Sequence, residues 1–156
     1  MRTAGLDASS DRFGFAVVDG DELVESRLCR FRPKEGWNST NVAGGLLRAY
    51  HELGALLRLY EPCALAVELV SVTTNMDTVR KIAYFEAAGL LAGSSQGLFV
   101  EQVRATTVRK GVLGKGNLKK KQVHEMIQDR YGAMSEDEAD ATVLALWMNK
   151  RMRGEL

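Results

Sequence analysis

The chain has 156 residues, 46% of them hydrophobic, and its 21 basic and 20 acidic residues give a formal net charge of +1 at pH 7. This length predicts one globular domain, residues 1–156, and no repeat, low-complexity tract or Pro/Gly-rich linker divides it. No apolar stretch is long enough to span a bilayer and no signal-peptide pattern opens the chain, so we expect a cytoplasmic protein. Cys29 and Cys63 lie in strand-like segments without metal-type spacing and are expected to be reduced thiols in the core.

Three strands are predicted at the start of the chain. Two apolar runs, Thr3–Asp7 and Phe13–Val18, have the length of strands. The pair Asp19-Gly20 is a strong signal for a hairpin that leads into a third strand, Glu22–Phe31. We therefore expect an antiparallel three-stranded sheet as the first part of the fold.

The middle of the chain predicts a helix and then a buried strand. Asn38 or Ser39 can cap a helix that ends before Pro62. The following run, Ala64–Val70, is apolar at every position except Glu68 and lacks the alternation of a half-exposed strand. This pattern is typical of a strand with both faces covered.

The rest of the chain predicts a helix from about Asn75 to Gly93, a strand at Leu98–Val103, a basic Gly-containing loop, and a helix from about Leu118 to Tyr131. Ser135 and Glu138 have the spacing of a capping box, which begins a last helix that reaches roughly Arg151. Together the elements predict an α/β fold. Its five-stranded mixed sheet has three antiparallel strands and then two parallel ones, with helices on both faces.

Four acidic residues stand out because of their surroundings. Asp7 ends the first predicted strand and Glu68 lies in the buried one, while Asp137 and Asp140 are three residues apart at the start of the apolar last helix. An ionised carboxylate in such surroundings is costly unless it is paired. Carboxylates that converge from distant parts of a chain repel one another, so they indicate divalent cations held by oxygen ligands. The chemistry that this pattern predicts is metal-assisted hydrolysis of a phosphodiester.

Each acid taken alone has a simpler explanation. Asp137 can stabilise the positive end of the helix dipole, Asp7 can cap the turn that follows it, and Glu68 can form a buried salt bridge with a basic residue of the next helix. Asp140 is harder to explain in this way, because it shares one helix face with Asp137. One common site accounts for all four.

The basic residues are unevenly distributed. No acid lies between Glu101 and Glu125, whereas seven basic residues do, and without these seven the chain has 14 basic residues against 20 acidic ones, a net charge of −6. A basic region on an acidic body indicates a surface that binds phosphates, and a solvated loop is the alternative. The candidate residues are Arg104, Arg109, Lys110, Lys115, Lys119, Lys120 and Lys121.

These features resemble a known family, the RuvC-type Holliday junction resolvases, which have a ribonuclease H-like fold. The resemblance covers nearly the whole chain. It rests on Gly5-Leu6-Asp7 followed by Gly14, on Ala66-Val67-Glu68, on the segment from Gly114 to Val123, and on Asp137-Glu138-Ala139-Asp140-Ala141. One Asp at the end of a strand is weak evidence, so the four acids in this order, with the basic segment before the last pair, carry the resemblance.

The resemblance implies a homodimer that binds four-way DNA junctions and nicks them symmetrically with Mg²⁺, for which Mn²⁺ can substitute. Asp7, Glu68, Asp137 and Asp140 would be the metal-binding catalytic carboxylates, with two ions about 4 Å apart. Arg109 and Lys120 match positions at which the family has basic residues near the scissile phosphate, so either would serve to offset its charge, and Lys120 is the expected catalytic residue. The uneven charge distribution adds the other five basic residues as expected DNA contacts. A branch-migration helicase is a further implied partner.

The dimer interface is expected on the helix that follows Glu68. Paired nicks in opposing strands need two active sites related by a two-fold axis, so the protein should be a symmetric dimer. Apolar and small residues that allow close approach recur on this helix at helical spacing. They are Ile82, Phe85, Gly89 and Ala92.

Two positions bear on contacts with DNA bases. Three residues after the catalytic glutamate the family often has an aromatic residue that wedges into the junction, and this chain has Ser71. A serine is too small to wedge between stacked bases, so we expect a weaker cleavage-sequence preference with hydrolysis unaffected. Trp37 lies in a predicted loop and can stack on a base, although ordinary packing explains it equally well.

Three other functions fit parts of the pattern. Another ribonuclease H-like nuclease, acting on flap or branched DNA or, like YqgF, on RNA, would share the carboxylates, and Asp11-Arg12-Phe13-Gly14 suits the RNA-processing alternative. Sugar-kinase and actin-like ATPases share the opening hairpin but need two such lobes, for which 156 residues are too few. A non-catalytic DNA-binding module is the third, and four intact acids count against it.

Overall fold

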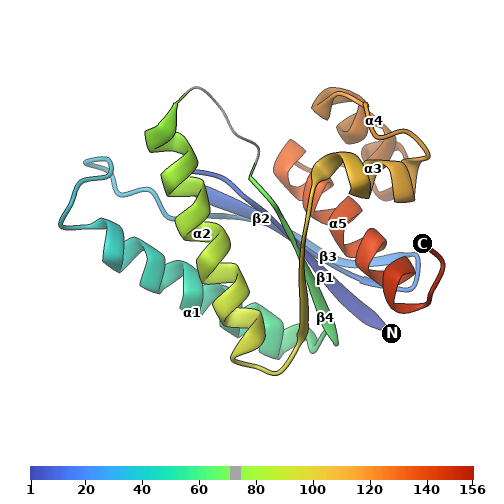
Figure 1. Ribbon diagram of the computed structural model, residues 1–156, viewed down its shortest axis with the longest axis horizontal. Coiled ribbons are helices and arrows are strands. Elements are labelled where there is room, and N and C mark those ends of the chain that lie inside the picture. The colour runs from blue at the N-terminus through green and yellow to red at the C-terminus, as the bar shows by residue number, and fades with distance from the viewer. Residues whose placement is uncertain (71–74) are drawn as a thin grey trace.

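The computed structural model describes residues 1–70 and 75–156. In chain order its elements are β1 (Arg2–Ala8), β2 (Arg12–Asp19), β3 (Glu22–Arg30), α1 (Val42–Tyr60), β4 (Ala64–Glu68), α2 (Met76–Ser94), β5 (Phe99–Val103), α3 (Ala105–Leu113), α4 (Lys120–Tyr131) and α5 (Glu136–Met152) (Figure 1). In the described part of the chain, no helix combines the length and the apolar character needed to cross a membrane. Ser71 and the prediction attached to it lie outside the described residues.

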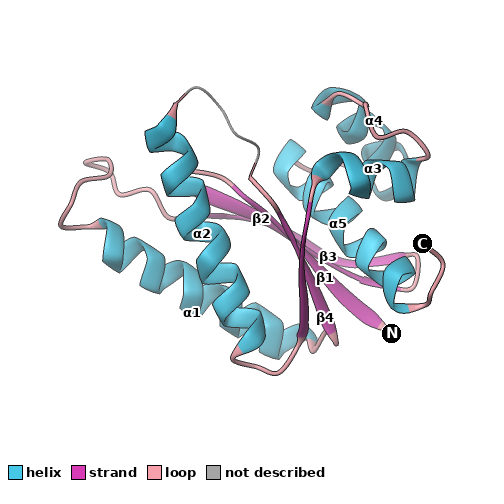
Figure 2. Ribbon diagram, in the orientation of Figure 1, coloured by secondary structure: helices cyan, strands magenta, loops and turns pink. Residues whose placement is uncertain are grey.

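The five strands form one mixed sheet in the order β3-β2-β1-β4-β5 (Figure 2). The pairs β1–β2 and β2–β3 are antiparallel, and the pairs β1–β4 and β4–β5 are parallel. This confirms the predicted α/β fold with three antiparallel strands followed by two parallel ones. Because β1 and β4 run in the same direction side by side, their carboxyl ends lie at one edge of the sheet.

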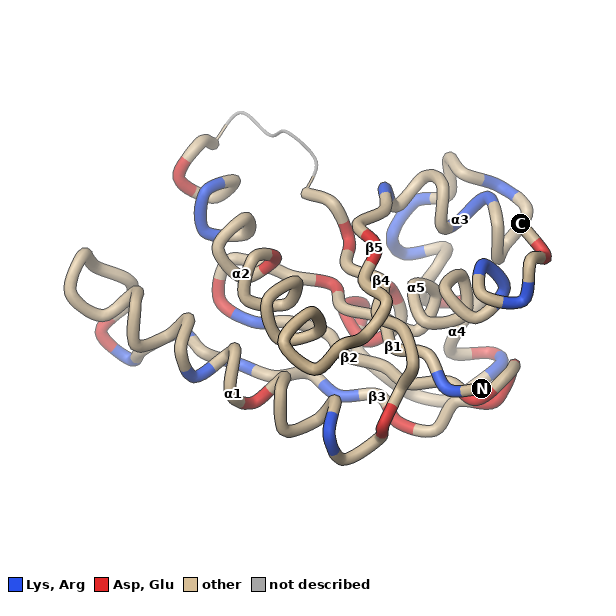
Figure 3. Tube along the Cα trace, turned by 60° about the horizontal axis from the view of Figure 1, so that its bottom comes forward, with Lys and Arg blue, Asp and Glu red and all other residues tan. Residues whose placement is uncertain are grey.

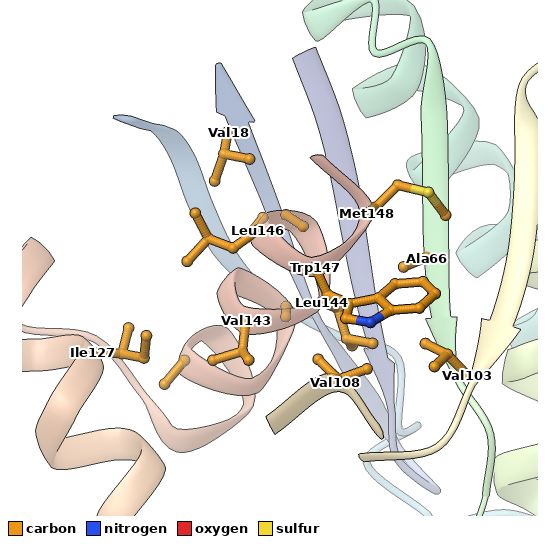
Figure 4. Packing of buried hydrophobic residues seen from close by; sticks show 14 of the residues in the cluster. Val18, Ala66, Val103, Val108, Ile127, Val143, Leu144, Leu146, Trp147 and Met148 are labelled. Carbon is orange, nitrogen blue, oxygen red and sulfur yellow. The ribbon is translucent and has the colours of Figure 1, made fainter. Parts of the chain in front are cut away.

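Helices cover both faces of the sheet: α1 and α2 lie on one face, and α5, flanked by α3 and α4, lies on the other (Figure 1). Successive residues of β2 point to opposite faces, as the pleat requires. Phe15 and Val17 pack in the cluster under α1 and α2, and Ala16 and Val18 pack in the cluster under α5. Figure 4 shows the second cluster, in which Leu144, Trp147 and Met148 of α5 pack against the sheet.

Helix α5 lies directly on the backbone of β1 and β2. A Cβ atom added to Gly5 would lie 2.1 Å from the carbonyl oxygen of Ala141, and one added to Gly14 would lie 2.1 Å from that of Asp137. Real side chains do not tolerate such contacts, so only glycine allows this approach. The first two turns of α5 are therefore held next to the carboxyl end of β1.

One element was missed. The segment predicted as a basic loop contains helix α3, whose sequence includes Thr106, Thr107 and Gly111, residues of low helix propensity. Tertiary contacts stabilise it, because Val108 is buried in the core and Arg109 forms an ion pair with Asp140 of α5. A helix held in this way leaves little trace in the local sequence pattern.

Three local predictions need correction or are confirmed. Helix α1 begins at Val42, with Asn41 as its N-cap residue in place of Asn38 or Ser39. The thiol of Cys29 is buried as expected, but Cys63 is exposed because it stands just ahead of β4. The capping box of α5 is confirmed. Ser135, the N-cap residue, and Glu138, at the third helical position, each accept a hydrogen bond through the side chain from the other's backbone N–H.

Three of the four residues predicted to form the dimer interface on α2 are buried in their own chain. Phe85 and Ala92 are 3% and 0% exposed, since they pack against the sheet of their own chain. A Cβ atom on Gly89 would lie 2.3 Å from Cδ2 of Leu6 in β1. Phe85, Gly89 and Ala92 therefore face inward and cannot contact a second molecule, whereas Ile82 is partly exposed.

We expect Gly14→Ala to destabilise the protein by roughly 1–3 kcal/mol or more, the cost of overpacking a close backbone contact. The matched control is Gly44→Ala in α1, where the nearest atom to a new Cβ is 3.9 Å away. That change should raise stability by roughly 0.5–1 kcal/mol, because alanine favours the helix. Urea unfolding of both variants measures this, and equal stability of the two would contradict the proposed packing.

Candidate active site

Three of the four predicted acids converge on one ammonium group. Asp7 stands near the end of β1, and Asp137 and Asp140 stand in the first two turns of α5. Lys120, the first residue of α4, places its Nζ 3.4 Å from Oδ2 of Asp7, 2.8 Å from Oδ1 of Asp137 and 3.2 Å from Oδ2 of Asp140. Residues from three separate elements are thus joined by one cation.

Two arginines bind the outer oxygens of the α5 carboxylates. Nε of Arg12 lies 2.6 Å from Oδ2 of Asp137, and Nη2 of Arg109 lies 3.3 Å from Oδ1 of Asp140. Arg109 also donates a hydrogen bond of 2.9 Å to the carbonyl of Leu118, which ties α3 to the segment before α4. Each α5 carboxylate therefore has one oxygen on an arginine and the other facing Lys120.

Arg12 was not among the residues expected at the site. Its sequence signal is weak, because a basic residue that opens a strand is common. The decisive information is the register: β1 and β2 pair Ala8 with Phe13, which sets Arg12 at the same sheet edge as Asp7. Only the pairing of the two strands reveals this.

Glu68 ends β4, next to β1 in the sheet. The register pairs Leu6 with Val67, so Asp7 and Glu68, the next residue on each strand, lie side by side on adjacent parallel strands. Among the described residues Glu68 forms no ion pair within 4 Å, and Arg80 pairs with Asp77 instead. The simpler explanation of Glu68, a salt bridge to the following helix, finds no support in the described residues.

The carboxylates of the site differ in how easily they ionise. Burial, together with the charge of Glu68, raises the pKa of Asp7 well above its ordinary value. Burial and then the charge of Asp140 raise the pKa of Glu68 to about 7. Burial would also raise the pKa of Asp137, but hydrogen bonds from Lys120 and Arg12 outweigh it and lower that pKa. The basic side chains thus stabilise the ionised form of Asp137 on α5. They do not offset the effect of burial on Asp7 and Glu68, which stand on the strands.

The incomplete neutralisation of these carboxylates raises the question of whether the site suits a divalent cation. Carboxylate oxygens are hard ligands of the kind that Mg²⁺ prefers. Within the described ranges no three acidic, histidine or cysteine side chains already enclose a metal-sized site, and the Lys120 ammonium lies between the carboxylates. The donor set fits a hard cation, which Asp7, Glu68, Asp137 and Asp140 would hold.

The seven predicted phosphate-contacting residues divide into two groups. Lys120 and Arg109 turn toward the carboxylates. The other five are exposed, one just ahead of α3 and the rest on α3, on α4 or on the segment between them. These five are Arg104, Lys110, Lys115, Lys119 and Lys121. Figure 3 marks the Lys and Arg positions of the chain in blue. The basic region therefore contains both site residues and a solvated surface.

Comparisons with known proteins find similar sequences and similar folds. A family model described as crossover junction endodeoxyribonuclease RuvC matches residues 3–147. A protein of that name from Xanthomonas campestris pv. campestris (strain B100) is 30% identical over 148 residues, which cover 93% of this chain and 85% of that protein. Another from Magnetococcus marinus is 29% identical over 155 residues, covering 94% of this chain and 82% of the relative.

Two solved structures share the fold. The structure of RuvC from Thermus thermophilus superimposes with a TM-score of 0.82 at 21% identity, covering 99% of this chain and 98% of that one. A structure of T. thermophilus RuvC in complex with a Holliday junction substrate gives a TM-score of 0.81 at 19% identity, with the same coverage. These likenesses extend over the whole α/β domain.

We expect the metal-free protein to lose stability as the pH rises from about 4.5 to about 7. In this window folded Glu68, whose pKa is raised from 4.5 to about 7, keeps a proton that the unfolded chain has released, so ionisation opposes folding. Glu68→Gln should remove a share of the loss, on the order of 2 kcal/mol. Urea unfolding in EDTA at several pH values measures this, and identical pH profiles of the variant and the unmodified chain would contradict the raised pKa.

Proposed function

The chain belongs to the RuvC family of crossover junction endodeoxyribonucleases, and on this basis we propose that it is a metal-dependent DNA endonuclease that cleaves four-way junctions by paired symmetric nicks. One observation carries the proposal most directly. Asp7, Asp137 and Asp140 converge on Lys120, with Glu68 beside them on the adjacent strand. This is a concentrated negative site with basic residues around it, which suits a cation and a phosphate together.

When bound, a divalent cation such as Mg²⁺ would polarise the scissile phosphate and lower the pKa of a water molecule. The chain's own residues prepare this chemistry. Arg12 and Arg109 hold the outer oxygens of Asp137 and Asp140, which fixes both carboxylate planes and leaves the opposite oxygens directed into the site. Lys120, exposed by 42% of its side chain, is placed to meet the incoming phosphate and offset its charge.

The five exposed basic residues of α3, α4 and the intervening segment would bind the DNA backbone at a distance from the chemistry. Such contacts position the duplex arms without reading sequence. Lys121 has 81% of its side chain exposed and only a loose ion pair of 3.8 Å with Glu125, so its charge remains available to DNA. Lys119, the N-cap residue of α4, is also exposed.

The alternative within the same fold is a nuclease for flap DNA or RNA. All these enzymes could use the carboxylate site, so the site chemistry does not separate them. The discriminating measurement is cleavage of a synthetic four-way junction beside flap, duplex and RNA–DNA hybrid substrates, each with Mg²⁺ and with EDTA. Faster cleavage of the flap or of the hybrid than of the junction would show that the junction is not the preferred substrate.

Symmetric nicking requires two copies, and the outward side of the α1–α2 layer offers an apolar groove for the second copy. The groove has a volume of about 380 Å³ and is lined by Ala43, Leu46, Leu47, Tyr50, Tyr84, Ala87, Ala88 and Leu91. Leu47 and Leu91 are 57% and 63% exposed, which is unusual for leucines that share one surface. We place the dimer contact here, on the side opposite to the inward stripe of α2.

We expect Asp7→Asn and Asp140→Asn to reduce nicking of a four-way junction to the level of an EDTA control. Junction binding should be retained or tightened, because each change removes a negative charge that repels phosphate. Gel-shift and nicking assays on one labelled junction measure both properties. The matched control is Asp129→Asn, an exposed position on α4, which should nick normally. Substantial nicking by both site variants would overturn the carboxylate assignment.

We expect the double variant Leu47→Glu, Leu91→Glu to be monomeric where the unmodified chain is dimeric, because two buried charges would oppose each contact. Leu59→Glu is the control, since Leu59 is 66% exposed on α1 but lies outside the groove. Analytical ultracentrifugation with and without a junction measures the mass. A monomeric unmodified protein, also on the junction, would contradict the dimer.

A further inference from the structure

A separate cavity lies between the segment that joins β3 to α1 and the first part of α2. It has a volume of about 350 Å³, and its lining includes Trp37, Asn38, Val42, Arg80, Lys81 and Tyr84. This volume falls in the range of roughly 300–1,000 Å³ that is usual for small-ligand pockets. None of these residues takes part in the carboxylate cluster, so the cavity has no role in the chemistry described above.

We propose that this cavity binds one unstacked nucleobase of the DNA substrate and so contributes to the choice of nicking site. The inference rests on the proposed function, because it assumes that DNA lies across the carboxylates. It adds a base-recognition site that the hydrolytic mechanism does not need. The supporting features are its position, its aromatic walls, a fixed amide donor and an unpaired cation.

The position follows from one hydrogen bond. Nε1 of Trp37 donates to the carbonyl oxygen of Ser10 at 2.9 Å, and Ser10 is three residues after Asp7. The cavity wall is therefore attached to the same turn that follows the first catalytic strand. Figure 1 shows the segment before α1 and the start of α2 at the same end of the molecule as the carboxyl end of β1. The wall is thus joined to the chain three residues after Asp7, which is why we assign the cavity a nucleotide of the DNA that the carboxylates would cleave.

The walls suit a flat ring. The indole of Trp37 packs on the ring of Phe85, with centroids 5.8 Å apart and planes at 56°, which fixes its orientation against the core. Tyr84, the residue before Phe85, is 41% exposed and also lines the cavity, as does Val42. Bases stack on aromatic side chains whatever their identity, so this pair provides affinity without strong selection.

A fixed amide provides a donor for a base edge. Oδ1 of Asn38 accepts hydrogen bonds from the backbone N–H of Thr40 at 2.9 Å, from that of Asn41 at 3.1 Å and from the hydroxyl of Thr40 at 2.6 Å. Backbone N–H groups can only donate, so the carboxamide cannot be flipped. Its NH₂ group has no hydrogen-bond partner among the described residues and is left to bind an acceptor on a ligand.

The rim carries positive charge for the phosphate of that nucleotide. Lys81 forms no ion pair with any residue in the described ranges, whereas Arg80 is already paired with Asp77. Lys81 is thus the cation that remains free to bind a phosphate on this side. The aromatic wall suits the face of a base, the amide donor suits the edge of the base, and the nearby cation suits the phosphate of the same nucleotide.

The first test is photochemical cross-linking of the full-length chain to a four-way junction with 5-iododeoxyuridine at successive positions around the crossover, followed by peptide mapping. The expected adducts lie on Trp37 or Tyr84 at one or two positions of the probe. Adducts confined to other residues at every probe position would overturn the proposal. A repeat with single-stranded DNA does not depend on cleavage or on junction binding, so it decides the cavity even if the proposed function fails.

The second test maps nick sites on a junction with a mobile core. Asn38→Asp keeps the oxygen that holds the turn but loses the amide donor, and it should lower the ratio of preferred to disfavoured sites about fivefold, as expected for one lost hydrogen bond. Lys81→Gln should weaken binding at the preferred site. Lys150→Gln, a change of the same kind in the last turn of α5, is the control and should alter neither property.

The outcomes separate the two hypotheses. If the unmodified chain neither binds nor nicks a four-way junction, the proposed function is wrong, and cross-linking to single-stranded DNA alone judges the cavity. If it nicks junctions and both cavity variants keep the original site ratio and affinity, the base pocket is wrong and the proposed function stands.

Discussion

The contact between α5 and the backbone of β1 and β2 is the constraint on which the rest of the structure depends. It exists because Gly5 and Gly14 have no Cβ atoms at two points where the helix carbonyls lie against the strands. The helix that carries Asp137 and Asp140 is thereby placed beside the strand that carries Asp7. A shift of α5 by the width of one methyl group would separate the carboxylates from each other and from Lys120.

The concentration of carboxylates creates an electrostatic cost that the chain only partly offsets. Lys120, Arg12 and Arg109 neutralise the α5 side, where the pKa of Asp137 is lowered. On the strand side the pKa values of Asp7 and Glu68 are raised, so these groups resist ionisation until more positive charge arrives. A site of this kind favours a divalent cation for the same reason that it lowers the stability of the metal-free fold.

The two faces of the sheet serve different purposes. The face under α5 holds the site, and its core includes residues from α3 and α4, so the basic helices are fixed relative to the carboxylates. The face under α1 and α2 is a conventional core whose outer side carries exposed leucines. The indole ring of Trp37 packs against the core under α1 and α2, and its N–H donates a hydrogen bond to Ser10 in the turn after Asp7. The wall of the proposed base pocket is thus tied to the strand that carries Asp7.

Local patterns in the sequence were sufficient to predict the five-stranded sheet, which of its strands are antiparallel and which parallel, and the capping box of α5. They also indicated the candidate acids. These depend on periodicity, turn signals and the cost of burying charge, which act over a few residues. The tertiary structure decided the rest: helix α3 exists through contacts with α5, Arg12 reaches the site through strand register, and the apolar stripe of α2 faces inward because Leu6 lies beneath Gly89. An apolar helix face has the same pattern whether a sheet or a second molecule covers it, so only the packed fold distinguishes them.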